Sequence, residues 1–207
     1  MTSSIHVSPT AFKKGYRAFQ KNEPRDAMYK TATFLVQHFW GNPADMADSL
    51  GVLLLTWNQA FYRYGSFRFS RLERAINRNM SALEALRGRD IATFAKVDEP
   101  EVKRLFAVFL RALRIAHGKK KDTKSPVAVA KALHLLAPSF LPTWDDKIAT
   151  GYGCYYSPPA ATKYVTFMYE MKRLAESLSC SLPPDCGKTF LKLIDEYNYA
   201  RFTKGWV

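Results

Sequence analysis

The chain has 207 residues, of which 47% are hydrophobic and 14% are aromatic. This composition excludes a disordered tail, a collagen-like chain and a scaffold held together by disulfides. Lysine and arginine number 31 against 18 aspartate and glutamate residues, so the formal net charge is +13. A polyanion is the natural partner of such a chain.

Membrane and metal signals are absent from the sequence. The longest apolar stretch, residues 50–55, is far shorter than the roughly 20 residues of a bilayer-spanning helix, and the start of the chain lacks the order of a signal peptide. Cys154, Cys180 and Cys186 cannot all pair, and they lack the close Cys/His spacing of zinc sites. We therefore expect a monomeric cytoplasmic protein with no membrane partner, no metal and no cofactor.

Helix signals follow one another along the chain. Ser8-Pro9 is typical of a helix start, and Pro24 opens an apolar-faced run that Gly41-Asn42-Pro43 ends. Residues 50–64 are nearly all apolar or aromatic, which predicts a central helix buried on most sides. Further helices are predicted over residues 70–79, 81–87, 101–117, 125–136, 144–150, 160–177 and 188–199.

These elements predict an all-α fold, because strand signals are almost absent. The chain is expected to form a single helical domain, and the one internal seam, which would divide it into two lobes with a cleft between them, lies near residues 98–100. The aromatic tail is predicted to close the core, with base stacking as the alternative; it comprises Tyr197, Tyr199, Phe202 and Trp206.

Most of the positive charge lies in two segments. Residues 63–78 carry a net charge of +4, and residues 101–125 carry +6. Such clusters supply the sequence-independent part of nucleic-acid affinity, although solvated helix faces are the alternative. In the second segment we predict contacts to DNA phosphates from the basic side chains and from one helix start, namely Arg111, Arg114, Lys119, Lys120, Lys121, Lys124 and Ser125.

A lysine and an aspartate stand in neighbouring predicted helices. Lys131 lies in one helix, Asp145 lies at the start of the next, and the proline-bounded connector would bring them together. A carboxylate at a helix N-terminus is stabilised in its ionised form, whereas a partly buried lysine has a lowered pKa and becomes nucleophilic. The structural alternative makes Asp145 a helix-start residue and Lys131 a surface charge.

This stretch resembles the helix-hairpin-helix DNA glycosylase superfamily, particularly small bacterial proteins with an 8-oxoguanine-glycosylase-type fold. The family's Lys…Pro…Pro…Asp segment is matched by Lys131, Ala132, His134, Pro138, Pro142 and Asp145. Residues 118–126 take the place of the family's hairpin without its repeated glycines. Residues 53–62 are similar to the family's early helix, where amide side chains follow aliphatic ones at the pocket wall. The resemblance spans roughly residues 50–153.

The resemblance implies a two-lobed helical fold and an enzyme that hydrolyses the N-glycosidic bond of a damaged or modified, flipped-out base. Asp145 would stabilise the oxocarbenium-like sugar and orient water, with Asp146 as the second choice. Lys131 would attack the sugar carbon and give AP lyase activity; without that attack the enzyme would be monofunctional. The base pocket would be lined by Trp57, Asn58, Gln59, Phe61 and Trp144.

The expected partner is duplex DNA in the nucleoid, and the role is base-excision DNA repair or antiviral defence. Oxidised purines, alkylated purines and hypermodified viral bases all suit an aromatic pocket. Two competing interpretations remain: a catalytically inactive nucleic-acid-binding protein of the same fold, and a helical adaptor that binds another protein.

Overall fold

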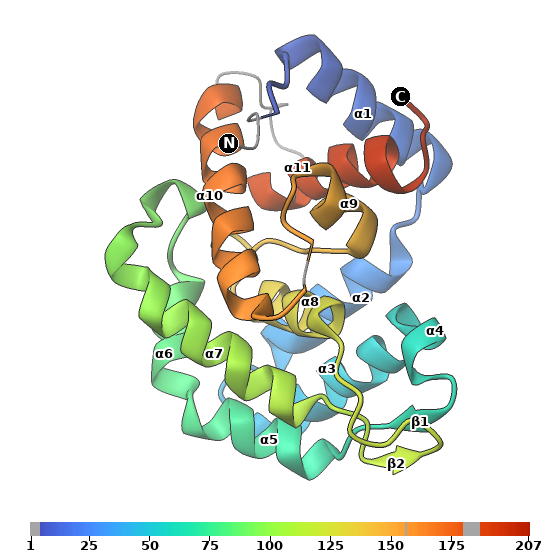
Figure 1. Cartoon of the computed structure of the whole chain (residues 1–207), viewed down its shortest axis with the longest axis vertical. Coiled ribbons are helices and arrows are strands. Elements are labelled where there is room, and N and C mark those ends of the chain that lie inside the picture. Colours follow the sequence, from blue (N-terminus) through green and yellow to red (C-terminus); the bar gives the residue numbers. More distant parts are fainter. Residues whose placement is uncertain (1–4, 156, 180–186) are drawn as a thin grey trace.

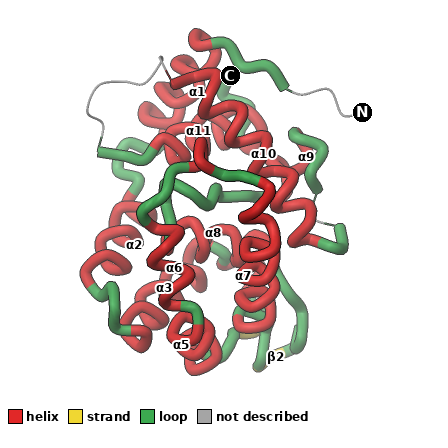
Figure 2. Tube along the Cα trace, turned by 90° about the vertical axis from the view of Figure 1, so that its left-hand side faces the viewer, coloured by secondary structure: helices red, strands yellow, loops and turns green. Residues whose placement is uncertain are grey.

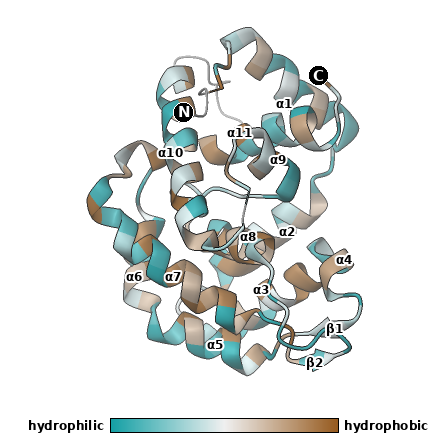
Figure 3. Ribbon diagram, in the orientation of Figure 1, coloured by the Kyte–Doolittle hydropathy of each residue, from teal (hydrophilic) through white to brown (hydrophobic). Residues whose placement is uncertain are grey.

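Helices make up nearly all the regular structure of residues 5–155, 157–179 and 187–207, which the computed structural model describes. The all-α prediction is confirmed for this part of the chain. Turning the molecule by 90° shows helices along most of the trace, with loops between them (Figure 2). Most helices carry both hydrophobic and hydrophilic residues, as expected of amphipathic helices that bury one face (Figure 3).

The first half of the chain contains seven α-helices and one short strand within the described residues. Their bounds are α1 (Pro9–Asn22), α2 (Ala27–His38), α3 (Pro43–Trp57), α4 (Gln59–Tyr62), β1 (Gly65–Ser66), α5 (Phe69–Arg78), α6 (Met80–Arg87) and α7 (Glu99–Ala112). The cap at Ser8 is as predicted, because its Oγ accepts a hydrogen bond from the Ala11 N–H and Pro9 occupies the first turn.

The second half contains β2 (His117–Gly118), α8 (Pro126–Leu136), α9 (Asp146–Gly151), α10 (Ala160–Leu178) and α11 (Phe190–Asn198), followed by a π-helical turn over Tyr199–Thr203. Helix α1 packs against α11, so the first and last α-helices lie together at one end of the molecule, away from α5 and the strands (Figure 1). Cys154 carries a free, buried thiol, whereas Cys180 and Cys186 lie outside the described residues.

The helix predicted over residues 50–64 is wrong at both ends. Asn42 caps the helix with its side-chain oxygen, so that α3 begins at Pro43. It ends at Trp57 because Asn58 leaves the helical region, with φ −113° and ψ 34°. The central position belongs to α8, whose residues from Ala128 to Leu136 are buried except for Lys131.

Residues 98–100 do not separate two packing units. A short 3₁₀ turn over Lys96–Asp98 leads directly into α7, and Arg89 holds Asp98 through two hydrogen bonds of 2.6 and 2.9 Å. Helix α7 then packs against α5, which precedes this point, and against α8 and α10, which follow it. One continuous apolar core therefore spans the place where the seam was expected.

The aromatic tail closes the core, as predicted. Tyr197 is buried against Phe12 of α1, with ring centres 6.0 Å apart. Phe202 packs edge-on against Tyr152 at 5.4 Å. This packing holds α11 and the turn after it against the body of the protein, where both contribute side chains to the site described next.

Candidate functional site

Lys131 is the one partly exposed residue in the otherwise buried stretch of α8. Its Nζ donates hydrogen bonds to Asn58 Oδ1 at 2.7 Å and to the Trp57 carbonyl at 3.2 Å. The same ammonium lies 4.5 Å from the centre of the Trp57 ring. These contacts depend on the end of α3, because the break at Asn58 frees the Trp57 carbonyl and turns the amide toward α8.

Burial lowers the pKa of Lys131 to about 8, and the negative charges of Asp195 and Asp145 oppose this shift only in part. Lys131 forms no ion pair within the described part of the chain. A neutral amine is therefore accessible near physiological pH, as lysine nucleophiles require. The alternative interpretation of Lys131 as a simple surface charge does not fit these surroundings.

Asp145 is the N-cap of α9, close enough for its charge to act on Lys131. Its Oδ1 accepts the Ile148 N–H at 2.7 Å, and its Oδ2 accepts the Thr203 hydroxyl at 2.8 Å. Burial raises its pKa, against the effect of these two hydrogen bonds. Both oxygens thus have structural partners. Asp146 is exposed and accepts the backbone N–H of Lys147.

A cavity of about 360 Å³ opens beside this group, between α1, α2, α11 and the end of α3. Aromatic rings form much of its wall, with both acidic and basic side chains among them. The aromatic residues are Phe19, Tyr29, Trp57 and Tyr199, and the charged residues are Glu23, Arg25, Asp26, Lys192 and Asp195. Trp57 belongs both to the cavity wall and to the surroundings of Lys131, and so it joins the two.

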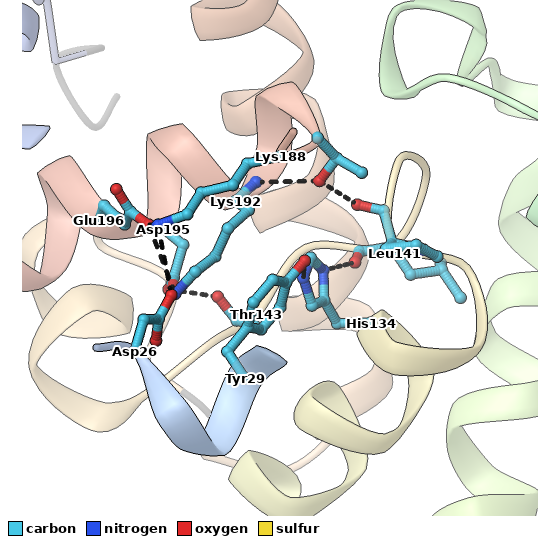
Figure 4. Close-up of polar contacts among 11 residues, drawn as sticks. Asp26, Tyr29, His134, Leu141, Thr143, Lys188, Lys192, Asp195 and Glu196 are labelled. Atoms are coloured by element: carbon cyan, nitrogen blue, oxygen red, sulfur yellow. Dashed lines mark hydrogen bonds and ion pairs between the residues drawn. The ribbon is translucent and has the colours of Figure 1, made fainter. Parts of the chain in front are cut away.

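Buried and partly buried side chains of opposite charge contact one another beside the cavity (Figure 4), and Asp26, Lys192 and Asp195 among them line it. The Lys192 side chain is 2% exposed, and its Nζ lies 3.3 Å from Asp26 Oδ2, 3.6 Å from Asp195 Oδ2 and 3.8 Å from Glu196 Oε1. Lys188 also contacts Asp26 and Glu196. We call these five residues the buried ion network. Because each cation has several carboxylate neighbours, the network is held in place by paired charges.

Polar contacts also fix the orientation of Asp195 and Tyr29 in the cavity wall. Asp195 accepts a hydrogen bond from the Thr143 hydroxyl. His134 Nδ1 donates to the Leu141 carbonyl at 2.8 Å, which leaves Nε2 to accept from the Tyr29 hydroxyl at 3.3 Å (Figure 4). Burial lowers the pKa of His134 to about 4, so this histidine is neutral at physiological pH and positions Tyr29.

The predicted base-pocket residues divide into three groups. Trp57 lines the cavity, and Asn58 is buried against Lys131 with its Nδ2 unpartnered among the described residues. Gln59 is exposed and Phe61 half-buried, and neither lines the cavity. The prediction for Trp144 is wrong: its ring is 1% exposed and packs in the core against Phe106, Tyr164 and Phe167.

The predicted phosphate contacts lie on the surface around the end of α7 and the loop before α8. Lys119, Lys120, Lys121 and Lys124 are exposed on the loop that follows β2. Ser125 is buried, and its Oγ caps α8 by accepting the Ala128 N–H at 3.1 Å. Arg111 and Arg114 instead line a separate groove. The seven residues are therefore near one another in the chain but differ in exposure and surroundings.

Sequence reasoning missed the residues that line the cavity from the two ends of the chain, Asp26, Tyr29, Lys192 and Asp195. One signal was present in the last helix. Lys192 and Glu196 are four residues apart on one face of α11, Lys188 stands four residues before Lys192 and just ahead of the helix, and Lys192 lies within the apolar run around Leu191 and Leu193. Charged side chains on an otherwise apolar helix face indicate that these side chains are buried and paired with opposite charges.

No protein-family model, curated protein or solved structure matches the chain. The resemblance to helix-hairpin-helix glycosylases therefore stays a prediction. Among the described residues, no cluster of three or more histidine, cysteine, aspartate or glutamate side chains could hold a metal ion. None of the described helices combines the length and apolarity needed to cross a membrane.

Proposed function

We propose that this protein is a DNA glycosylase that removes a damaged or modified base from a flipped-out nucleotide, in DNA repair or antiviral defence. The observation that carries the proposal is Lys131, a largely buried amine with a pKa lowered to about 8, held against Trp57 beside an aromatic-lined cavity. A perturbed lysine beside a cavity is a candidate nucleophile.

The cavity suits a flipped base. Its volume of about 360 Å³ lies within the range typical of small-molecule sites. Trp57 and Tyr29 offer aromatic surface on which a base can stack. The buried Nδ2 of Asn58, which lacks a partner in the described residues, is a donor available to an acceptor atom of the nucleotide.

The chemistry follows from the neutral amine of Lys131. Its lone pair attacks C1′ of the deoxyribose, the bond to the base breaks, and the departing base takes the bonding electron pair and a proton. The amine loses its proton to a carboxylate or water, and opening of the sugar ring leaves a Schiff base. If water attacks C1′ in place of the amine, the product is an abasic site.

We consider two carboxylates for the role of stabilising the positive charge that would develop on the sugar. Both have partners within the protein: Asp145 accepts two hydrogen bonds, and Asp195 accepts one from Thr143 and lies 3.6 Å from Lys192. Asp195 lines the cavity, and its charge is the larger of the two influences on Lys131. We therefore assign Asp195 the role of facing the reacting nucleotide, beside Asp145 as first predicted.

The test is Schiff-base trapping with duplexes that carry oxidised, alkylated or hypermodified bases. Borohydride should link the wild-type protein to DNA, and Lys131→Ala should abolish the adduct. Lys13→Ala, an exposed lysine on α1, is the matched control. Mass spectrometry of the released base identifies the substrate.

Each other outcome has a defined meaning. Base release without any trapped adduct would show that Lys131 does not attack the sugar and that the enzyme is monofunctional. In that case Asp195→Asn and Asp145→Asn should each lower the rate of base release. Binding with no base released from any damaged, genomic or viral DNA would overturn the enzyme and favour a catalytically inactive DNA-binding protein of this fold.

A further inference from the structure

A second cavity, of about 500 Å³, lies between α5 and α7, and six of its ten lining residues are arginine. We call it the arginine groove, and its basic residues are Arg71, Arg74, Arg78, Arg104, Arg111 and Arg114. No aspartate or glutamate of the described chain lines it. It shares no residue with the cavity beside Trp57, which is built from α1, α2, α3 and α11.

Most of these arginines have no counter-charge. Arg71, Arg74, Arg78 and Arg111 form no hydrogen bond or ion pair through their side chains with any described residue. Only two of the six are engaged. Arg104 binds Glu101 at 2.6 Å and Asn79 at 2.7 Å, and Arg114 lies 3.2 Å from Asp122. Six cations around one hollow repel each other, so the groove favours an anionic occupant.

The arrangement of the arginines fits a row of phosphates. Arg71, Arg74 and Arg78 recur at spacings of three and four, and therefore follow one face of α5 over about 10 Å at the helical rise per residue. Arg104, Arg111 and Arg114 face them from α7 and the residues just after it. Guanidinium groups bind phosphate oxygens in pairs, so two facing rows can hold successive phosphates of one strand.

The groove continues into a second basic surface. The chain passes from α7 through β2 into the loop that carries Lys119, Lys120, Lys121 and Lys124. The ion pair between Arg114 and Asp122 joins the end of the groove to this loop. The loop is itself fixed by Gly118, at φ +101°, where an added Cβ would lie 2.2 Å from the Tyr64 carbonyl oxygen. Only glycine permits this close pairing with β1.

We propose that the arginine groove binds the phosphodiester backbone of one strand of duplex DNA, and that the lysine loop extends this contact. The choice of DNA rests on the function proposed above, whereas the phosphate chemistry rests on the groove alone. A cavity of about 500 Å³ admits one backbone but not a whole duplex. The groove therefore anchors DNA at a site separate from the cavity where a base would be held.

The experiment measures binding of an undamaged duplex of about 20 base pairs over a series of salt concentrations. The variant Arg71→Ala/Arg74→Ala/Arg78→Ala should weaken binding at least tenfold and lower the slope of log K against log salt by about 2 to 3, since each lost phosphate contact removes about 0.9. The matched control is Lys13→Ala/Arg17→Ala/Lys21→Ala, which removes three exposed charges from α1 at the far end of the molecule.

Two further arms make the assignment specific. Arg71→Lys/Arg74→Lys/Arg78→Lys keeps the charge but loses the paired contacts, so it should bind more weakly than wild type and more tightly than the alanine variant. Tripolyphosphate should compete only weakly with the duplex. If it competes as well as an equal concentration of duplex phosphate, the groove is a site for small polyphosphates and the strand assignment is wrong.

The remaining outcomes separate this proposal from the proposed enzyme. Equal loss of affinity in the α5 and α1 variants would overturn the groove and indicate a diffuse charge effect. Circular dichroism checks folding, and the single exposed change Arg74→Glu tests the groove should the triple variant misfold. Failure of base release, with arginine-dependent binding intact, would count against the glycosylase and leave the groove in place.

Discussion

The buried ion network and the arginine groove hold positive charge in opposite ways. In the network, Lys188 and Lys192 are surrounded by Asp26, Asp195 and Glu196 and are largely withdrawn from water. In the groove, six arginines line an open hollow that has no acidic side chain among the described residues. In the network each lysine is paired with carboxylates of the protein. In the groove most of the arginines have no carboxylate partner in the described chain, so an anionic ligand can pair with them.

Lys131 lies between these two extremes. It is largely buried like Lys192, but its contacts are an amide oxygen, a carbonyl and an aromatic ring, with no ion pair in the described chain. Burial without a paired charge lowers the pKa of an amine, whereas burial with carboxylates keeps it protonated. The comparison therefore teaches that chemistry is expected at the unpaired buried cation, stability at the paired ones and anion binding at the groove.

The largest expected effect comes from breaking the network. Lys192→Met removes the cation that contacts Asp26, Asp195 and Glu196 and leaves Lys188 to pair with Asp26 and Glu196 alone, so it should lower the free energy of unfolding by about 3–5 kcal/mol, as does removal of one partner of a buried ion pair. Urea denaturation measures this loss. Lys13→Met, an exposed lysine on α1, is the control. A Lys192 variant within about 1 kcal/mol of wild type would contradict the role assigned to the network.

A smaller effect is expected from pH at Lys131. The pKa is lowered to about 8, so the neutral fraction of the amine rises about tenfold from about pH 7 to about pH 9. Adduct formation with abasic or modified DNA should rise with pH by the same factor and level off above the pKa. Single-turnover trapping measures the profile. A flat profile over this range would show that a neutral Lys131 does not limit the reaction.

The smallest effect is expected on the free energy of unfolding when one arginine of the groove is removed. Arg74 is exposed and has no partner in the described chain, so Arg74→Ala should change the free energy of unfolding by less than about 0.5 kcal/mol. The substitution should stabilise the protein slightly at low salt, where like charges repel most, and this stabilisation should disappear at high salt. Denaturation at two salt concentrations tests this. A clear loss of stability would mean that Arg74 supports the fold and is not reserved for a ligand.

Local signals in the sequence predict much of the fold. Ser8-Pro9 and Ser125-Pro126 begin helices as predicted, because a cap and a first-turn proline act through residues close in the chain. The start of α3 at Pro43 was missed although Asn42-Pro43 is a signal of the same kind. The end of α3 was missed because Asn58 departs from the helix in the presence of Lys131, seventy-three residues away.

The candidate site was predicted only in part, for the same reason. Lys131, Asp145 and Trp57 were named from one connector and one helix end, and the structure brings them to one region. Asp195, Asp26 and Tyr29 come from the two ends of the chain, and only the packing of α1, α2 and α11 brings them to the cavity. Trp144 was misassigned because a tryptophan next to Asp145 carries no mark of the direction in which its ring packs.

Asp195 and Thr203, which complete the surroundings of Lys131, are among the last residues of the sequence to be translated. Every arginine of the groove is translated before residue 115, whereas the carboxylates near Lys131 gain their last partners only when residues 189–203 fold back. If both proposals hold, the residues that contact DNA phosphates therefore precede in the chain those that complete the surroundings of Lys131.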